Sequence, residues 1–259
     1  MNSLRNHRSA APAEHGFSLI ELMISMLILT LIMAVIFQEI TLVQQRSAAE
    51  QTKLDMFQES REFVDQMSRD LHQAGFPSPR NFGLGALTAD PNRPTSPYAA
   101  DYRVAMGLTK VDSGDLWFEG DVDGTGSVSV VHYHLDTSTA NNCPCLKRSQ
   151  QQKINGDPLT GQTNPVYQVE VQNVQNGDST SPIYFAYSHG STGTALTLPL
   201  DFNANAKTLA SIDTVKIVMT VQASTPDPKT GVKPITTLVS TVKLNNCSAA
   251  KSGQFMSCQ

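Results

Sequence analysis

An uninterrupted apolar run over residues 17–37 constrains this chain more than any other feature of its sequence. The run contains no Pro or Gly, and its only polar residues are Ser18, Glu21, Ser25 and Thr30. At 1.5 Å rise per residue, a helix of about 21 residues is roughly 31 Å long, which is the thickness of a bilayer's hydrocarbon core. We therefore predict a membrane-spanning helix. An ionisable group at the depth of Glu21 is costly, so a partner for it is expected.

A secretory signal peptide or a plain membrane anchor would also begin with an apolar run. A signal peptide ends its apolar region at a small-residue cleavage site. Here the run ends in Val35, Ile36 and Phe37, followed by the polar Gln38 and Glu39. The sequence therefore argues against a signal peptide.

The residues before the run form a short polar leader, residues 1–16, which carries Arg5, His7 and Arg8. The leader ends in Gly16, an aromatic residue follows at Phe17, and the fifth residue of the run is Glu21. This combination resembles the cleavage and methylation site of type IV prepilins. The resemblance implies that a membrane-bound prepilin peptidase cuts between Gly16 and Phe17 on the cytoplasmic side and methylates the new amino terminus of Phe17.

Glu21 is the expected counter-charge for that amino terminus. Methylation keeps the charge of an amine, and a buried carboxylate without a partner is strongly disfavoured. In pilins the implied partner is the terminal amine of a neighbouring subunit, which sets the axial register of the filament. The alternatives are that Glu21 pairs within its own helix or extends towards the membrane surface.

The helical pattern continues beyond the membrane span. Residues 38–73 contain no Pro or Gly and are rich in good helix formers. Apolar residues recur at helical spacing, at Leu54, Phe57, Val64, Met67 and Leu71. Gly75, followed by Pro77 and Pro79, is a stop signal. We predict one helix over residues 18–74, with a membrane and filament-core part (17–40) and an amphipathic part (41–76) that buries one face against a folded domain. A coiled-coil partner is the alternative for that face.

The segment that closes this helix carries a second resemblance. Residues 69–76 read Arg-Asp-Leu-His-Gln-Ala-Gly-Phe, and this pattern resembles minor pilins of the PilW type. It is more distantly similar to the large minor pseudopilin of type II secretion. His72 stands where the pattern usually has Arg.

The remaining residues, 77–259, are predicted to form an exported globular domain rich in β-strands. Residues 77–103 are Pro-rich and polar, which indicates a loop. Beyond them the apolar residues alternate with polar ones, which is typical of half-buried strands. Strands are expected near residues 116–118, 128–135, 167–171, 183–187, 215–221 and 238–244. With no helix expected between them, the strands indicate an antiparallel sheet packed on the long helix, a pilin-like α+β fold.

Charge and motifs exclude several functions. The net charge is −4, and no basic cluster exceeds a pair such as Lys147 and Arg148, so nucleic-acid binding is not expected. The sequence contains no Gly-x-Ser-x-Gly, no phosphate-binding Gly-rich loop and no His-Glu-x-x-His. We therefore predict that the protein is not an enzyme, and no cofactor is implied.

Residues 119–126 suggest a calcium loop. Asp121 and Asp123 alternate ahead of Gly124, as in the first half of a loop whose oxygen ligands face one ion. The second half of such a loop, including its Glu, is absent. A tight hairpin that uses Asp-Gly turn chemistry is the simpler expectation.

The four cysteines are Cys143, Cys145, Cys247 and Cys258, all in the part predicted to be exported, where disulfides form. Pilins commonly close a C-terminal loop with a disulfide, and this resemblance favours pairing Cys247 with Cys258. Four cysteines allow three connectivities. Because Cys143 and Cys145 could join only through a small ring, pairing of either with a C-terminal cysteine is the alternative.

A zinc site is a further hypothesis. His132 and His134 lie on one face of a predicted strand, and with Cys143 and Cys145 they would complete four ligands. Ordinary hydrogen-bonded strand histidines are the simpler expectation.

Together these features predict a minor pilin that helps to start or cap a type IV pilus. Its expected partners are prepilin peptidase, major and minor pilins and the inner-membrane assembly platform. It would cross the inner membrane once, with its amino terminus cytoplasmic and its globular domain periplasmic, and reach the cell surface after assembly. A minor pseudopilin of type II secretion, or an adhesin or binding module carried on a pilin stalk, remains an alternative.

Overall fold

The computed structural model describes residues 16–83, 85–93, 96–139, 143–156, 159, 164–188, 193–227 and 230–245. The chain divides into two units, Met1–Ala48 and Ala49–Gln259. The helix α1 (Leu19–His72) contributes to both. We describe each unit by itself.

The first unit consists of the N-terminal part of α1. The helix is 54 residues long in all, which confirms the helix predicted over residues 18–74 to within two residues at its C-terminal end. Apolar side chains such as Leu22, Leu29 and Phe37 are exposed all around it. In the described part of the chain, α1 is the one helix long and apolar enough to cross a membrane.

In the second unit, α1 contributes one face to a hydrophobic core. Phe63, Val64, Met67 and Leu71 are buried there, together with the polar Ser60 and Asp70. The predicted apolar stripe is therefore confirmed from Val64 onwards. Leu54 and Phe57 of the same stripe are 60% and 36% exposed, because they precede the turns of α1 that contribute to the core.

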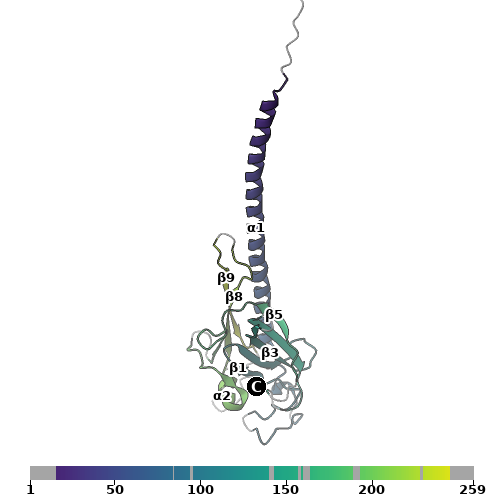
Figure 1. Cartoon of the computed structure of the whole chain (residues 1–259). Coiled ribbons are helices and arrows are strands. Elements are labelled where there is room, and N and C mark those ends of the chain that lie inside the picture. The colour runs from purple at the N-terminus through teal and green to yellow at the C-terminus, as the bar shows by residue number, and fades with distance from the viewer. Residues whose placement is uncertain are drawn as a thin grey trace, which may run out of the picture. The chain divides into compact units, whose positions relative to one another are not determined.

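Two antiparallel sheets complete the second unit, and Figure 1 shows their strands gathered around the C-terminal part of α1. The larger sheet has the order β5-β4-β3-β2-β1-β7, and the smaller has the order β6-β8-β9. The strands are β1 (Gly107–Val111), β2 (Asp115–Gly120), β3 (Ser129–Asp136), β4 (Cys145–Gln152), β5 (Gln168–Gln172), β6 (Tyr184–Tyr187), β7 (Leu200–Asp201), β8 (Thr214–Gln222) and β9 (Ile235–Lys243). The long helix packed on antiparallel sheet confirms the predicted pilin-like α+β fold.

The six predicted strands correspond to β2, β3, β5, β6, β8 and β9. The elements β1, β4 and β7 were not predicted. β4 reads Cys-Leu-Lys-Arg-Ser-Gln-Gln-Gln, so it lacks the apolar alternation that marks a strand. It forms because β3 pairs with it along its whole length, from Cys145 opposite Asp136 to Gln152 opposite Ser129.

The expectation that no helix interrupts the strands was wrong. A short helix, α2 (Phe202–Ala210), lies between β7 and β8. Asp201 caps it by accepting a hydrogen bond from the backbone N–H of Ala204 at 2.8 Å. Phe202 and Leu209 are buried, and this tertiary packing stabilises a helix too short to be evident from periodicity alone.

The end of α1 is joined directly to the end of β2. The backbone N–H of Gly75 donates to the Glu119 carbonyl at 2.9 Å, and that of Asp121 donates to the Phe76 carbonyl at 2.8 Å. Gly75 has a φ of 80°, the left-handed conformation that glycine adopts after a helix. At Gly120 the approach is so close that an added Cβ would lie 2.5 Å from the Gln73 carbonyl oxygen.

We expect Gly120→Ala to lower the free energy of unfolding of the second unit by roughly 1–3 kcal/mol, because the new methyl group must displace backbone atoms. Chemical denaturation followed by the fluorescence of Trp117, the single tryptophan of the chain, would measure this loss. The matched control is Gly83→Ala, since nothing lies within 4 Å of a Cβ at that position. Equal stability of the two variants would contradict the prediction.

Candidate functional site

The predicted cleavage junction lies immediately before α1. Gly16, Phe17 and Ser18 are non-helical, and Phe17 is 83% exposed, so the junction is accessible. The Ser18 carbonyl accepts the backbone N–H groups of Glu21 at 3.0 Å and Leu22 at 3.2 Å, which starts the helix.

Glu21 lies in the first turn of α1, where the helix dipole favours a negative charge. The Ser25 hydroxyl donates to the backbone carbonyl of Glu21 and not to its carboxylate. Over residues 16–48 of the described chain, no hydrogen bond or ion pair reaches the Glu21 carboxylate. Pairing within its own helix is therefore not seen there, and the Glu21 side chain is exposed.

A buried polar cluster fixes the last turns of α1 against the larger sheet. Asp70 accepts three hydrogen bonds at Oδ2, from the Tyr133 hydroxyl at 2.7 Å and from Nε and Nη2 of Arg148 at 3.0 and 2.8 Å. Burial, together with the nearby Asp70 charge, raises the pKa of Tyr133 well above its usual value, so its hydroxyl stays protonated and donates. The cluster joins the last turns of α1 to β3 and β4.

A second cluster, the Asp115 cluster, joins strands β1, β2 and β3. Asp115 Oδ1 lies 2.8 Å from both His132 Nε2 and His134 Nδ1, while Lys110 Nζ donates to Oδ2 at 2.9 Å. The Tyr167 hydroxyl lies 2.6 Å from His132 Nδ1. The strand register explains this convergence, because Asp115 is directly opposite His134 and His132 is its neighbour on the same face of β3.

Burial and hydrogen bonding together set the protonation of the Asp115 cluster. Burial lowers the pKa of His132 and outweighs the opposing effect of Asp115, so the imidazole is neutral at pH 7. Burial would raise the pKa of Asp115, but hydrogen bonds from His132, His134 and Lys110 overcome this and hold it well below its usual range. Asp115 is therefore a carboxylate in contact with two imidazoles.

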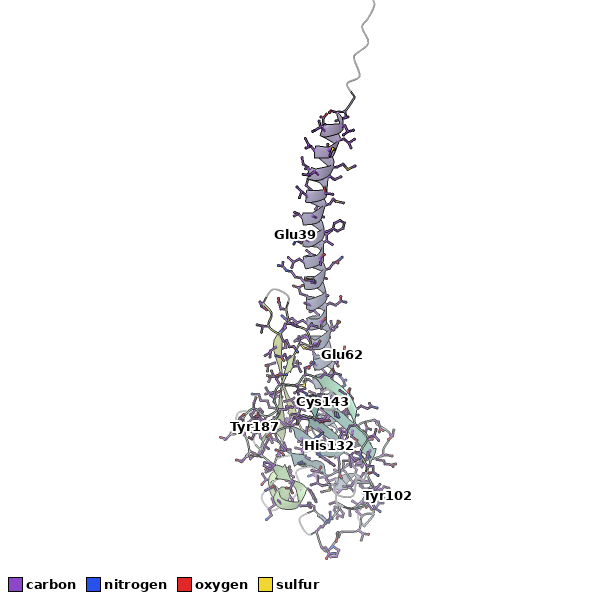
Figure 2. The ribbon with its side chains drawn as sticks, viewed as in Figure 1. Glu39, Glu62, Tyr102, His132, Cys143 and Tyr187 are labelled. Atoms are coloured by element: carbon purple, nitrogen blue, oxygen red, sulfur yellow. A yellow bond between two sulfur atoms is a disulfide. The ribbon has the colours of Figure 1, made fainter. Side chains whose placement is uncertain are left out.

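The hypothesised zinc ligands do not come together. Cys143 and Cys145 form a disulfide, which removes both thiolates, and their neighbour is Asp136 and not the two histidines. Figure 2 shows His132 and Cys143 at separate places in the second unit. The alternative that Cys143 or Cys145 pairs with a C-terminal cysteine was also wrong. Cys247 and Cys258 lie outside the described residues, so their pairing stays a prediction.

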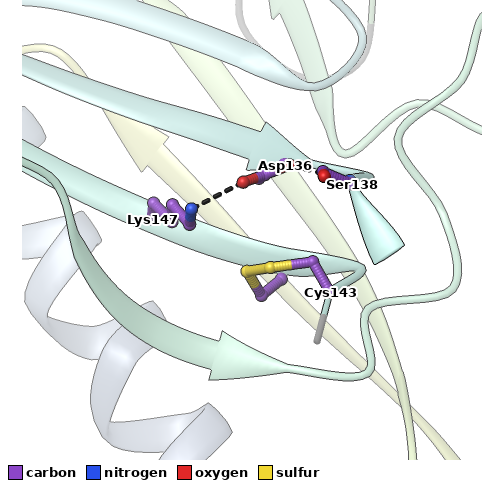
Figure 3. Close-up of a disulfide and its surroundings, with 5 residues drawn as sticks. Asp136, Ser138, Cys143 and Lys147 are labelled. Atoms are coloured by element: carbon purple, nitrogen blue, oxygen red, sulfur yellow. Dashed lines mark hydrogen bonds and ion pairs between the residues drawn. A yellow bond between two sulfur atoms is a disulfide. The ribbon is translucent and has the colours of Figure 1, made fainter. Parts of the chain in front are cut away.

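The disulfide lies at the start of β4, where Cys145 is directly opposite Asp136 of β3. Figure 3 shows Lys147 in an ion pair with Asp136 beside it, and the Nζ–Oδ2 distance is 2.5 Å. The Asp136 carboxylate also accepts the backbone N–H of Ser138 at 2.7 Å. The disulfide constrains the chain at the start of β4, and the ion pair of Lys147 with Asp136 joins β4 to β3.

The aspartates of the hypothesised calcium loop lie in the turn between β2 and β3. Asp121 accepts the backbone N–H groups of Thr125 at 3.0 Å and Gly126 at 2.9 Å, and Asp123 accepts the Thr125 hydroxyl at 2.8 Å. β2 and β3 form an antiparallel pair, but residues 121–128 connect them, so the expected tight hairpin is not what forms. Calcium binding stays a hypothesis, and the turn has protein donors for both carboxylates.

A polar cavity of about 530 Å³ lies beside the turn between β2 and β3. Its lining includes Arg148, Gln150 and Gln152 of β4, Gln168 of β5, and Asp123. Amide and guanidinium groups of this kind can hydrogen-bond a polar ligand. No local motif marks this cavity, because its residues come from separate parts of the chain.

Sequence reasoning also missed Asp115, Lys110 and Tyr167 as partners of the two histidines, and Arg148 as the partner of Asp70. Asp70 and Arg148 are 78 residues apart. No local motif links such residues, and only pairing of the strands brings them together.

Residues 12–37 match the family described as the prokaryotic N-terminal methylation motif. The match contains Gly16, Phe17, Glu21 and the apolar run to Phe37. No curated protein and no solved structure matches the chain.

Proposed function

We propose that this chain is a minor pilin of the PilW type. The premise is the N-terminal methylation motif, which supports a type IV pilin- or pseudopilin-like prepilin, a structural rather than a catalytic protein that prepilin peptidase processes. Its apolar helix is consistent with anchoring in the inner membrane before assembly. In this role it joins the complex that starts or caps a pilus.

The proposed mechanism is assembly. Cleavage after Gly16 leaves a methylated Phe17 with a positive charge. The exposed apolar side chains of α1 lie against those of other pilins in the filament core, and Glu21 of one subunit neutralises the amine of the next. The charge pair fixes axial register because any other register leaves both charges unpaired in an apolar environment.

The segment over residues 69–76 is the observation that carries the PilW-type assignment. It resembles minor pilins in sequence, and two of its residues join the end of α1 to the larger sheet. Asp70 is held by Tyr133 and Arg148, and Gly75 bonds to β2. His72, where Arg is usual, lies 3.0 Å from the Lys243 backbone oxygen through Nδ1.

A pilin-anchored binding module is the second candidate. The polar cavity beside the turn between β2 and β3 favours it, because an amide-lined hollow of this size accommodates a small polar ligand. Replacing both Gln150 and Gln168 with Ala would then abolish binding of that ligand, while filaments would still form.

Mass spectrometry of the N-terminal peptide tests the proposed role. Sheared surface filaments and the membrane fraction are compared for peptides beginning at Phe17. We expect methylated Phe17 in the sheared filaments. Processed protein confined to the envelope would instead identify a pseudopilin of type II secretion. An intact leader in both fractions would contradict cleavage at Gly16.

A further inference from the structure

We propose that Asp115, His132 and His134 form a binding site for a divalent transition metal ion of the zinc class. The site uses two imidazole nitrogens and one carboxylate oxygen, which is a donor set that suits such ions. It differs from the hypothesised zinc site that included Cys143 and Cys145, whose sulfur atoms are joined in a disulfide.

The three donor atoms already converge. His132 Nε2 and His134 Nδ1 each lie 2.8 Å from the same oxygen, Asp115 Oδ1, and all three donor atoms lie within 4.8 Å of one another. Donors about 2.0–2.2 Å from a tetrahedral zinc ion lie roughly 3.3 Å apart. The three side chains contact one another directly, and they need to move apart only slightly to admit the ion.

The tautomer of His132 can adapt to the ion. Without metal, Nε2–H donates to Asp115, and Nδ1 accepts from the Tyr167 hydroxyl at 2.6 Å. When Nε2 binds a metal, the proton moves to Nδ1, which then donates to the same hydroxyl oxygen. This is the outer hydrogen bond that metal-binding histidines usually make, and it orients the ring. The ring of Trp117, with its centroid 3.9 Å from that of His132, also restricts its orientation.

The other carboxylate oxygen of Asp115 forms an ion pair with Lys110. Lys110 Nζ lies 2.9 Å from Oδ2, so this oxygen stays occupied and Asp115 binds the ion through Oδ1 alone. The site is open to solvent through His134, whose side chain is 40% exposed, while His132 is 7% exposed. A water molecule can therefore complete the coordination shell of the ion.

Isothermal titration calorimetry with Zn²⁺ on the full-length protein, purified in detergent without a His tag, tests the site. We expect one Zn²⁺ per chain, weakened at least about tenfold in His134→Gln and roughly 10–100-fold in Tyr167→Phe. The matched control is His72→Gln, because His72 lies against the Lys243 backbone and outside the cluster. It should bind Zn²⁺ as the unaltered protein does.

Circular dichroism of each variant shows whether it is folded. Because His134 is exposed, His134→Gln should disturb the fold less than a change at a buried ligand. Ca²⁺ is titrated in parallel, because it prefers oxygen ligands. The proposal is overturned if Zn²⁺ binds the unaltered protein and folded His134→Gln equally, if no saturable binding occurs, or if Ca²⁺ binds as tightly as Zn²⁺.

Discussion

Replacing Lys153 with Met is expected to lower the free energy of unfolding of the second unit by roughly 3–5 kcal/mol. Lys153 and Glu119 form an ion pair in which both side chains are 0% exposed, with a distance of 2.7 Å between Nζ and Oε2. The change deprives the buried Glu119 carboxylate of its ammonium partner. Chemical denaturation followed by Trp117 fluorescence measures the loss.

The pair also organises the chain before β1. Lys153 Nζ donates to the Val104 carbonyl at 2.6 Å, and Glu119 Oε2 accepts the backbone N–H of Met106 at 2.9 Å. Part of the expected loss therefore comes from the segment just before β1. The Val104 carbonyl loses its ammonium donor, and the backbone N–H of Met106 bonds to a Glu119 carboxylate that Lys153 no longer holds in place.

Two further variants separate the buried charge from the loss of a lysine. Lys243→Met removes an exposed lysine and should change stability by less than about 0.5 kcal/mol. Combining Glu119→Leu with Lys153→Met should recover much of the stability, because a buried pair replaced by apolar residues is often close to neutral. If Lys153→Met is no more harmful than Lys243→Met, the pair does not have the proposed importance.

Replacing Glu21 with Gln is expected to leave cleavage at Gly16 intact and to reduce incorporation into filaments by more than about a hundredfold. The substitution keeps the shape of the side chain but leaves the methylated amine of the neighbouring subunit without its counter-charge. An unpaired buried charge costs roughly 3–5 kcal/mol, and each 1.36 kcal/mol corresponds to a factor of ten. Quantitative immunoblotting of sheared filaments against the membrane fraction measures the ratio.

The control is Glu39→Gln, on the same helix and likewise exposed, which should assemble normally. The mass of the N-terminal peptide shows whether each variant was processed. Processed Glu21→Gln that still enters filaments at the normal level would refute the register role of Glu21. Loss of assembly in both variants would mean that the helix requires charge in general.

Sequence alone determined the features that depend on neighbouring residues. The absence of Pro and Gly between residues 17 and 73 predicted α1, and Gly75 predicted its end, because helix formation and termination are local. Apolar alternation predicted β8, whose side chains alternate between buried and half-buried positions from Val215 onwards. The Gly16–Phe17 junction and Glu21 are likewise readable without a fold, since the matched motif is contiguous.

Which polar residues meet depends on the tertiary structure. Pairing of β3 with β4 brought Arg148 beside Tyr133 and thus to Asp70, and pairing of β2 with β3 set Asp115 opposite His134. The same pairing carried His132 and His134 to Asp115 and away from Cys143 and Cys145. The type of a side chain determines which bonds it can make, but its partner depends on strand register. Register is fixed by the burial of the whole core rather than by any one segment.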